Sequence, residues 1–324
     1  METRLLSAAS PRDLDEAAAL LRRGGLVAFP TETVYGLGAL ALEPLAVRAI
    51  FAAKARPPGN PLIVHVLGED DARPLLLRWP MEARQLAARF WPGPLTLVLP
   101  RTALVPDEVT AGGDTVAVRA PSHPVARALL ERVGAPLAAP SANSAQHVSP
   151  TSAAHVLRDL NGRIDAVLDG GRCPVGIEST VLSLDGPAPR LLRAGAISRA
   201  QLEDLLGPIE TGPRPGARVA QSPGQQHRHY APAAFVRLAE APELAVAVAE
   251  LRGHIGVLLR GDTPAPPATA VARLPADSAG YARGLYAALR DLEDADCNAI
   301  VVEQVPQGAE WDAIRDRLTR AAGG

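Results

Sequence analysis

Eight hydrogen-bonding or charged side chains are concentrated in one stretch of the chain, residues 31–65, between strongly apolar runs. They are Thr31, Glu32, Thr33, Tyr35, Lys54, Arg56, Asn60 and His65. Polar groups that border buried strands must be paired or solvated, so these side chains either satisfy one another or line a polar cavity. Lys54 is the only lysine among 33 basic residues. Because a compact ammonium cannot be copied by a planar guanidinium, the lone lysine indicates a site that needs an ammonium.

Three cations stand beside turns rich in Gly and Pro, where phosphate groups could approach backbone N–H groups. They are Lys54, Arg56 and Arg193. The chain has no GxxxxGK[ST] motif, which excludes a P-loop. Taken singly, each cation is more simply interpreted as a solvated surface charge. PSAN, residues 140–143, weakens that interpretation, because it follows an expected buried strand, where the ligand loops of open α/β sheets lie.

Other motifs have simple structural alternatives. Ser149 or Thr151 would cap the next helix with or without a ligand. GIEST, residues 176–180, could be a turn with a local hydroxyl bond at the start of a strand. His227 and His229 are two residues apart without a third ligand nearby, which is a weak metal signal. No GxSxG motif is present to indicate a nucleophilic serine.

Composition excludes several classes of protein. At 324 residues the chain is long enough for two domains. Its net charge of −2 gives no overall attraction to a polyanion, whereas a nucleic-acid binder more often has a basic face. Cys173 and Cys297 are the only cysteines, so no disulfide framework or zinc cluster is implied. No apolar run approaches ~20 residues, and the N-terminus has no signal-peptide pattern. We therefore expect a cytoplasmic protein.

Hydrophobic periodicity and turn residues predict intermixed strands and helices as far as residue 206. The expected helices cover 14–23, 44–55, 81–90, 123–133, 151–160 and 198–206, the last with Ser198 as N-cap. The expected strands cover 26–29, 61–67, 95–100, 115–121, 135–140, 164–171, 179–184 and 190–195. Because the two types are mixed rather than strictly alternating, we expect an α/β fold with a twisted mixed sheet and packed helices.

The pattern stops between residues 207 and 234, in a segment dense in Pro, Gly, Gln and His. This segment is too long for an ordinary loop, so we interpret it as a linker. Strand and helix then alternate from residue 235 to the end, which predicts a smaller three-layer, Rossmann-like α/β domain. No GxGxxG opens its first helix, so dinucleotide binding is not supported. The expected division is 1–206, 207–234 and 235–324.

Nine ordered motifs together resemble those of the threonylcarbamoyl-AMP synthase family. They are GLVAFPTETVYGLG, KARPPGNPLIVH, WPGPLTLVL, TVAVRAPSHP, PSAN, SPT, DGGRCPVGIEST, LLRAGAIS and SPGQQHRHYAP. Each motif alone is weak, but the ordered set covers nearly the whole chain and is very specific. The form that the chain resembles is the long one, with a YrdC-like catalytic domain and a smaller C-terminal domain.

The resemblance implies an enzyme that condenses L-threonine, bicarbonate and ATP into L-threonylcarbamoyladenylate and pyrophosphate. The product would pass to the machinery that forms threonylcarbamoyladenosine (t6A) in tRNA. Mg²⁺ is expected with ATP, because most of its ligands can come from the nucleotide and water, and no protein side chain is assigned to it. We expect no membrane association and no strong direct binding of nucleic acid.

The resemblance also implies residue roles. Lys54 and Arg56 would be catalytic cations that neutralise charge on the α-phosphate and departing pyrophosphate. The implied ATP contacts are Arg56, Asn60, Thr115, Ser141, Asn143, Ser149, Arg193 and Tyr230. The implied threonine contacts are Thr33, His65, Arg119, Ala139 (through its backbone) and Ser179. Among these, Arg119 can hold the amino-acid carboxylate with two parallel hydrogen bonds.

Three loops depart from the usual family pattern. PSAN is followed by SAQHV rather than by a nearby Ser-Gly, RHYAP lacks a preceding aromatic residue and lysine, and Ala194 replaces a proline. The linker nevertheless carries Arg228, His229 and Tyr230 in sequence, which a plain tether does not need. An acyl adenylate must form away from water, so we expect the linker to act as a lid over the catalytic site.

Two other functions fit the same fold. One is a carbamoyltransferase accessory module of the kind used in hydrogenase maturation. The absence of zinc-finger cysteines and of an acylphosphatase-like segment disfavours it. The other is a non-catalytic binder of double-stranded RNA, which the net charge of −2 disfavours.

Overall fold

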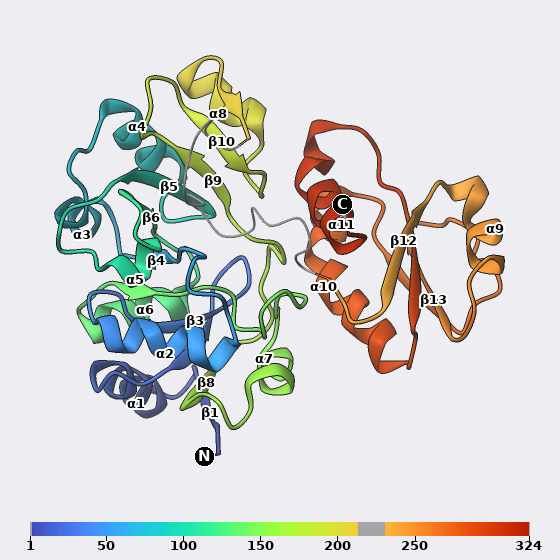
Figure 1. Ribbon diagram of the computed structural model, residues 1–324, viewed down its shortest axis with the longest axis horizontal. Helices are drawn as coiled ribbons and strands as arrows, with labels where there is room; N and C mark the ends of the chain where they lie inside the picture. Colours follow the sequence, from blue (N-terminus) through green and yellow to red (C-terminus); the bar gives the residue numbers. More distant parts are fainter. Residues whose placement is uncertain (1, 213–230, 324) are drawn as a thin grey trace. The chain divides into compact units, whose positions relative to one another are not determined.

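The computed structural model describes residues 2–212 and 231–323, which fall into two compact units (Figure 1). The first unit holds residues 2–145, 150–174 and 178–212. The second holds residues 231–323 together with two short segments from earlier in the chain, 146–149 and 175–177. The second unit is therefore built from three separate segments of the chain.

An eleven-stranded mixed sheet is the framework of the first unit, with strand order β1-β8-β2-β3-β7-β4-β6-β5-β9-β10-β11. The strands are β1 (Arg4–Ser7), β2 (Val27–Pro30), β3 (Tyr35–Leu40), β4 (Ile63–His65), β5 (Leu95–Pro100), β6 (Thr115–Arg119), β7 (Leu137–Ala138), β8 (Ala166–Asp169), β9 (Thr180–Ser183), β10 (Arg190–Arg193) and β11 (Glu210–Thr211). Near its centre, β4 pairs parallel with β6 and antiparallel with β7, and β5 pairs antiparallel with β6. The predicted mixed sheet is thus confirmed.

The helices described in the first unit are α1 (Pro11–Arg22), α2 (Pro44–Lys54), α3 (Glu69–Ala72), α4 (Met81–Phe90), α5 (Asp107–Thr110), α6 (Pro124–Val133), α7 (Ala153–Leu160) and α8 (Arg199–Leu206). Four of them, α1, α6, α7 and α8, begin at a residue whose side chain caps the helix, and α3 and α5 were not predicted from the sequence. Helix α8 has a capping box, in which Ser198 accepts from the Gln201 N–H and the Gln201 side chain accepts in return. The predicted N-cap at Ser198 is confirmed.

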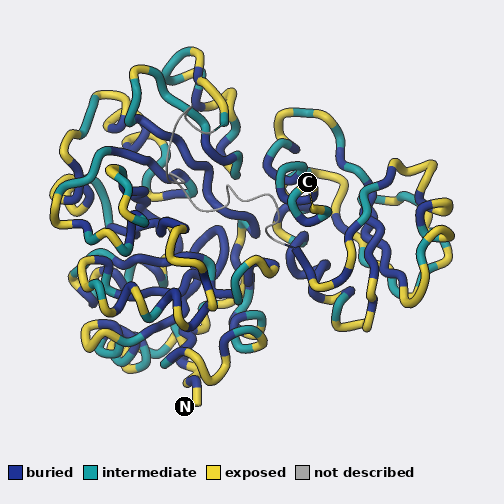
Figure 2. The backbone as a smooth tube through the Cα atoms, in the orientation of Figure 1, coloured by how far each residue is buried: buried dark blue, intermediate teal, exposed yellow. Residues whose placement is uncertain are grey.

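The two halves of the large sheet are packed differently. In β2, Val27 and Phe29 belong to a core shared with α1 and α6, whereas Ala28 belongs to a larger core with α2, α4, α7 and α8. Alternate residues of β2 therefore enter cores on opposite faces, and Figure 2 shows the strands running through the buried interior. In the β4-β6-β5-β9 half, one face joins the larger core. The other face carries only a small apolar cluster of Ile63, Val98, Ala117, Val181 and Leu192.

A four-stranded parallel sheet of order β12-β15-β13-β14 forms the second unit. Its strands are β12 (Phe235–Ala239), β13 (Ile255–Arg260), β14 (Ala270–Leu274) and β15 (Ala299–Glu303). Its helices are α9 (Leu244–Ala249), α10 (Ser278–Asp294) and α11 (Asp312–Ala321). Helix α9 packs on β12 and β15, α10 on β13 and β14, and α11 on β12. Figure 1 shows α9 on one side of the sheet and the other two helices opposite, which confirms the predicted three-layer α/β domain.

Four strands were not predicted from the sequence: β1, β3, β11 and β14. Strand β3 contains Gly36 and Gly38, which interrupt its apolar pattern. A Cβ atom at Gly38 would lie 2.7 Å from the Phe29 ring on β2, so the glycine is needed for the β2–β3 pairing. In β14 only Leu274 is fully buried, so its pattern is that of an edge strand. Within the described ranges, no helix has both the length and the apolar composition that a membrane crossing requires.

Replacing Gly195 with alanine should destabilise the first unit. A Cβ atom there would lie 2.2 Å from the backbone nitrogen of Thr180 and 2.5 Å from the carbonyl carbon of Ser179. These close contacts can be relieved only if the backbone at the start of β9 moves. We expect this strain to lower the free energy of unfolding by about 1–3 kcal/mol. Urea denaturation of Gly195→Ala measures this. Gly186→Ala is the control, because its nearest atom would be 3.8 Å away. Equal midpoints for the two variants would contradict the prediction.

Candidate active site

The side chains predicted to bind an amino acid gather at the ends of neighbouring strands. His65 ends β4 and Arg119 ends β6, and the two residues are direct partners in the parallel register. Residues two apart in a strand share a face, so His65 lies on the face of Ile63 and Arg119 on that of Ala117. Both apolar residues belong to the small cluster. The polar site therefore occupies the sheet face opposite the larger core.

Arg119 is a deeply buried charged group of this site, with 3% of its surface exposed. Its Nη1 donates to the Thr33 hydroxyl at 2.9 Å, and its Nε donates to the Gly93 carbonyl at 3.4 Å. Its Nη2 lies 2.7 Å from Glu32 Oε1. This contact is an ion pair rather than an aligned hydrogen bond, because neither atom has a hydrogen-bond partner. The guanidinium thus keeps N–H groups that no protein acceptor takes up.

The Thr31 and Thr33 hydroxyls form a short hydrogen-bond network beside Arg119. Thr31 Oγ1 donates to the Val34 carbonyl at 2.7 Å and accepts from the backbone N–H groups of Thr33 and Val34. The Thr33 hydroxyl lies 2.8 Å from Thr31 Oγ1, a contact in which either oxygen could be the donor, and it accepts from Arg119 Nη1. A hydroxyl oxygen has two lone pairs, so Thr33 can also accept from a ligand.

His65 is neutral in this site. Burial and the neighbouring Arg119 cation lower the pKa of its imidazole to about 3. Its Nδ1 is buried and has no hydrogen-bond partner. Buried polar atoms in native proteins are normally paired. Three such atoms, His65 Nδ1, Arg119 Nη2 and Glu32 Oε1, occur on these neighbouring residues, which is the pattern expected of a site that completes its hydrogen bonds with a polar ligand.

Ser179, the residue before β9, joins a second group of polar side chains with Thr96 on β5 and Arg193 on β10. Its hydroxyl lies 2.7 Å from Thr96 Oγ1 and accepts from Arg193 Nη2 at 3.1 Å, while Arg193 Nε donates to the Ser179 carbonyl at 3.1 Å. Thr96 was not predicted as a site residue, although it is the only polar residue in LTLVLP. The N–H of Ala139 donates to the Ile63 carbonyl, so a backbone contact from Ala139 to a ligand would use its carbonyl oxygen.

Lys54 holds the PSAN loop. Its ammonium is almost fully buried and donates to the backbone carbonyls of Ser141 and Asn143. Burial, with the nearby Arg56 charge, lowers the pKa of Lys54 well below its usual value. A lysine at the end of α2 thereby positions the loop that carries Ser141 and Asn143.

The other predicted nucleotide contacts are more dispersed. Arg56 is buried and donates to the carbonyls of Asn60 and Pro61 at 3.4 and 3.2 Å. Thr115 begins β6, four residues from Arg119, which places it about 13 Å away at the rise of an extended strand. Ser149 is fully buried in the segment grouped with the second unit. Tyr230 and most of the predicted lid, 213–230, lie outside the described residues.

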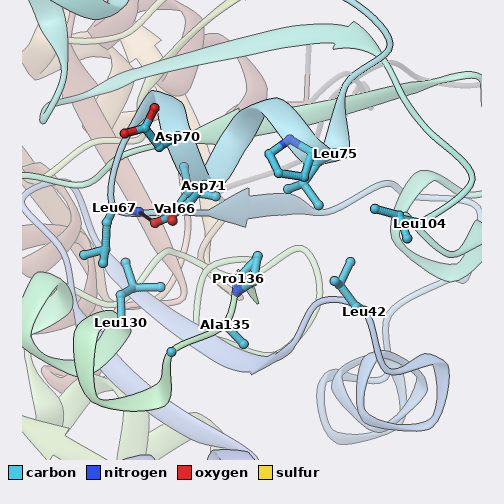
Figure 3. A pocket seen from close by; sticks show the side chains of 12 residues that line it. Leu42, Val66, Leu67, Asp70, Asp71, Leu75, Leu104, Leu130, Ala135 and Pro136 are labelled. Atoms are coloured by element: carbon cyan, nitrogen blue, oxygen red, sulfur yellow. Dashed lines mark hydrogen bonds between the residues drawn. The ribbon is translucent and has the colours of Figure 1, made fainter.

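Among the described residues, neither a metal cluster nor the cavity of Figure 3 coincides with this site. Across residues 2–212 and 231–323, no three His, Cys, Asp or Glu side chains are grouped so that they could hold a metal ion. A cavity of about 320 Å³ lies where β4 ends and β7 begins (Figure 3). Apolar groups such as Leu42, Leu104 and Leu130 line most of it, and Asp71 at its edge accepts from the Leu67 N–H. None of the predicted site residues lines this cavity.

Comparison with known proteins agrees with this architecture. Residues 19–195 match the Sua5/YciO/YrdC family model, described as telomere recombination, and residues 197–323 match the C-terminal domain of threonylcarbamoyl-AMP synthase. Threonylcarbamoyl-AMP synthase of Pyrococcus abyssi is 43% identical over 95% of this chain and 93% of its own length. That of Bacillus subtilis is 44% identical over 95% and 92%. The crystal structure of P. abyssi Sua5 complexed with L-threonine superposes with a TM-score of 0.94 and 40% identity, covering 100% of this chain and 98% of that one.

The fold and the buried polar face define a YrdC-like catalytic unit followed by a smaller α/β unit. The chain belongs to the threonylcarbamoyl-AMP synthase family of enzymes, in its two-domain form.

His65 should not titrate in the physiological range. Its pKa of about 3 in the folded protein lies below the value of about 6.5 in an unfolded chain. The unfolded state therefore binds more protons as the pH falls below about 6.5, and this residue then destabilises the fold. We expect the His65 ring signals in NMR spectra to stay constant from pH 5 to 8, whereas the urea-unfolded chain titrates near 6.5. A folded-state midpoint near neutrality would refute this assignment.

Lys54→Arg should be poorly active although it keeps the charge. The wider, planar guanidinium cannot replace an ammonium between the two PSAN carbonyls without moving the loop. We expect kcat/KM to fall by roughly 10- to 100-fold, equivalent to about 1.4–2.8 kcal/mol. Arg48→Lys is the control on the same helix, because Arg48 is exposed and pairs only with Glu108 on the surface. Near-normal turnover of Lys54→Arg would show that the lone lysine has no special role.

Proposed function

We propose that this enzyme condenses L-threonine, bicarbonate and ATP into L-threonylcarbamoyladenylate and pyrophosphate, for t6A formation in tRNA. The names of the full-length relatives and the threonine complex of P. abyssi Sua5 support this reaction. One observation in this chain carries the proposal furthest. Arg119 is a desolvated guanidinium whose Nη2 has no aligned acceptor, beside a neutral imidazole and an accepting hydroxyl.

Threonine would bind through both of its polar ends. The Arg119 guanidinium can hold the α-carboxylate with paired N–H donors. The Thr33 lone pair can accept from the substrate's hydroxyl or nitrogen, and His65 Nδ1 can form a further hydrogen bond. His65 is not the base that deprotonates the amine, because a pKa of about 3 makes it too weak.

The proposed chemistry has two steps. The threonine amine, after losing a proton, attacks the carbon of bicarbonate, and loss of water leaves an N-carboxylate. One oxygen of that group then attacks the α-phosphorus of ATP, and the bond to the bridging oxygen of pyrophosphate breaks. Charge builds on the phosphates in the second step, where fixed cations stabilise it most effectively. Arg56 is the cation proposed to act there.

Lys54 would serve the nucleotide through the PSAN loop. Its ammonium fixes the carbonyls of Ser141 and Asn143, so that the side chains of this loop are preorganised for the phosphates. Mg²⁺ is expected with ATP, and most of its ligands can come from the phosphates and water. When bound, it would neutralise phosphate charge.

Pyrophosphate release should require threonine and bicarbonate together. Incubation with ATP, L-threonine and ¹⁴C-bicarbonate should yield pyrophosphate and a labelled adenylate in equal amounts, and omission of either co-substrate should abolish both. Serine should be used less well by roughly 10- to 200-fold, because one methyl group is worth about 1–3 kcal/mol. Release of ADP and phosphate, or equal use of serine, would show that the reaction or its specificity is wrongly assigned.

A further inference from the structure

Glu32 is the buried carboxylate next to Arg119. Only 4% of the residue is exposed, and its Oε1 lies 2.7 Å from Arg119 Nη2. Its other oxygen, Oε2, accepts from the backbone N–H of Ser122 at 3.1 Å. Ser122 lies in the turn between β6 and α6. Glu32 is therefore anchored to the backbone three residues beyond the arginine that it faces, and its position does not depend on a ligand.

A buried guanidinium needs such a counter-charge. A single charge transferred from water to a protein interior is strongly disfavoured unless an opposite charge accompanies it. The hydrogen bonds of Arg119 to Thr33 and Gly93 are to neutral oxygens. Glu32 supplies the negative charge at ion-pair distance, and it restricts the rotation of the guanidinium plane.

The alignment of this ion pair is informative. Glu32 Oε1 approaches Nη2 closely, yet no N–H of Nη2 is directed at it. A guanidinium has five N–H groups in a rigid fork. Nη1 uses one of its two with Thr33, and Nε uses its own with Gly93. One N–H on Nη1 and those on Nη2 consequently remain for a second, incoming carboxylate.

We propose that Glu32 is a positioning residue for substrate recognition, acting through Arg119 and not by contact with the reacting atoms. It compensates the charge of the buried guanidinium and orients it, so that its remaining N–H groups meet the α-carboxylate of the amino-acid substrate. This inference rests on the proposed function, because it takes threonine as the ligand of Arg119. Its effect should be specific to threonine and should leave ATP binding unchanged.

Glu32→Gln tests the role of the charge, since the amide keeps the size of the side chain and an oxygen for the Ser122 N–H. We expect calorimetry to show L-threonine binding weakened at least tenfold, with ATP affinity changed less than twofold. In turnover, the KM for threonine should rise more than kcat falls. Glu43→Gln, at an exposed carboxylate of the same unit, is the matched control and should leave threonine and ATP binding unchanged.

Two further variants separate positioning from a merely structural role. Glu32→Asp keeps the charge but moves it away from Arg119 by the length of one methylene group. If Glu32 positions Arg119, the KM of this variant for threonine should lie between those of the wild type and Glu32→Gln. Glu32→Asp also replaces Glu32→Gln as the test if the latter does not fold. In an Arg119→Lys background, Glu32→Gln should have much less effect on threonine binding, because the residue through which it acts is already altered.

The outcomes also distinguish this inference from the proposed function. If the wild-type protein binds no threonine and makes no adenylate, the proposed function fails. If the wild type binds threonine and both Glu32 variants bind it equally well, Glu32 is not a positioning residue although the function stands. Equal losses of threonine and ATP binding in Glu32→Asp would likewise overturn the inference, because they would indicate a general structural defect.

Discussion

Desolvation of the Arg119 guanidinium is the constraint on which the rest of the site depends. The end of β6 places this cation on the sheet face that lacks the larger core, where it is nearly fully buried. Burial of a charge is tolerable only when charge and hydrogen bonds compensate it. Glu32 compensates the charge, and Thr33 and Gly93 take part of the hydrogen bonding. Burial, together with the positive charge of Arg119, lowers the pKa of His65 and keeps its imidazole neutral. The charged guanidinium of Arg119 and the neutral imidazole of His65 therefore lie on adjacent strands.

A second buried cation has a different function in the fold. Lys54 ends α2 and directs its ammonium to two backbone carbonyls, so its main effect is on the shape of the PSAN loop. Arg119 retains N–H groups that protein acceptors do not take up, whereas Lys54 is committed to the loop. A carbonyl pair in a closed space favours a compact donor, which accounts for an ammonium at this position.

Much of the fold was predictable because hydrophobic period and turn chemistry agree locally. Helix α4 and strand β5 have the predicted bounds, and α8 begins at its predicted cap. Strand β3 was missed because its glycines serve contact with Phe29 on β2, a requirement that no local pattern reveals. The site was predicted as a set of residues through family resemblance. Thr96 escaped prediction, since one hydroxyl in an apolar strand carries meaning only once its partner Ser179 is known.

The sequence by itself determined the types of most elements, the mixed α/β class and the second α/β domain, because these follow from short-range periodicity. It also determined the family, through the ordered motifs. Only the tertiary structure decided which polar residues meet. His65 and Arg119 are 54 positions apart in sequence, yet they are register partners. The pairing of Glu32 with Arg119 and of Lys54 with the PSAN carbonyls spans still larger separations, of 87 to 89 positions. Such contacts arise from strand register and burial, which depend on the whole sheet. The assignment of 146–149 and 175–177 to the second unit has the same cause, because packing brings together segments that sequence separates.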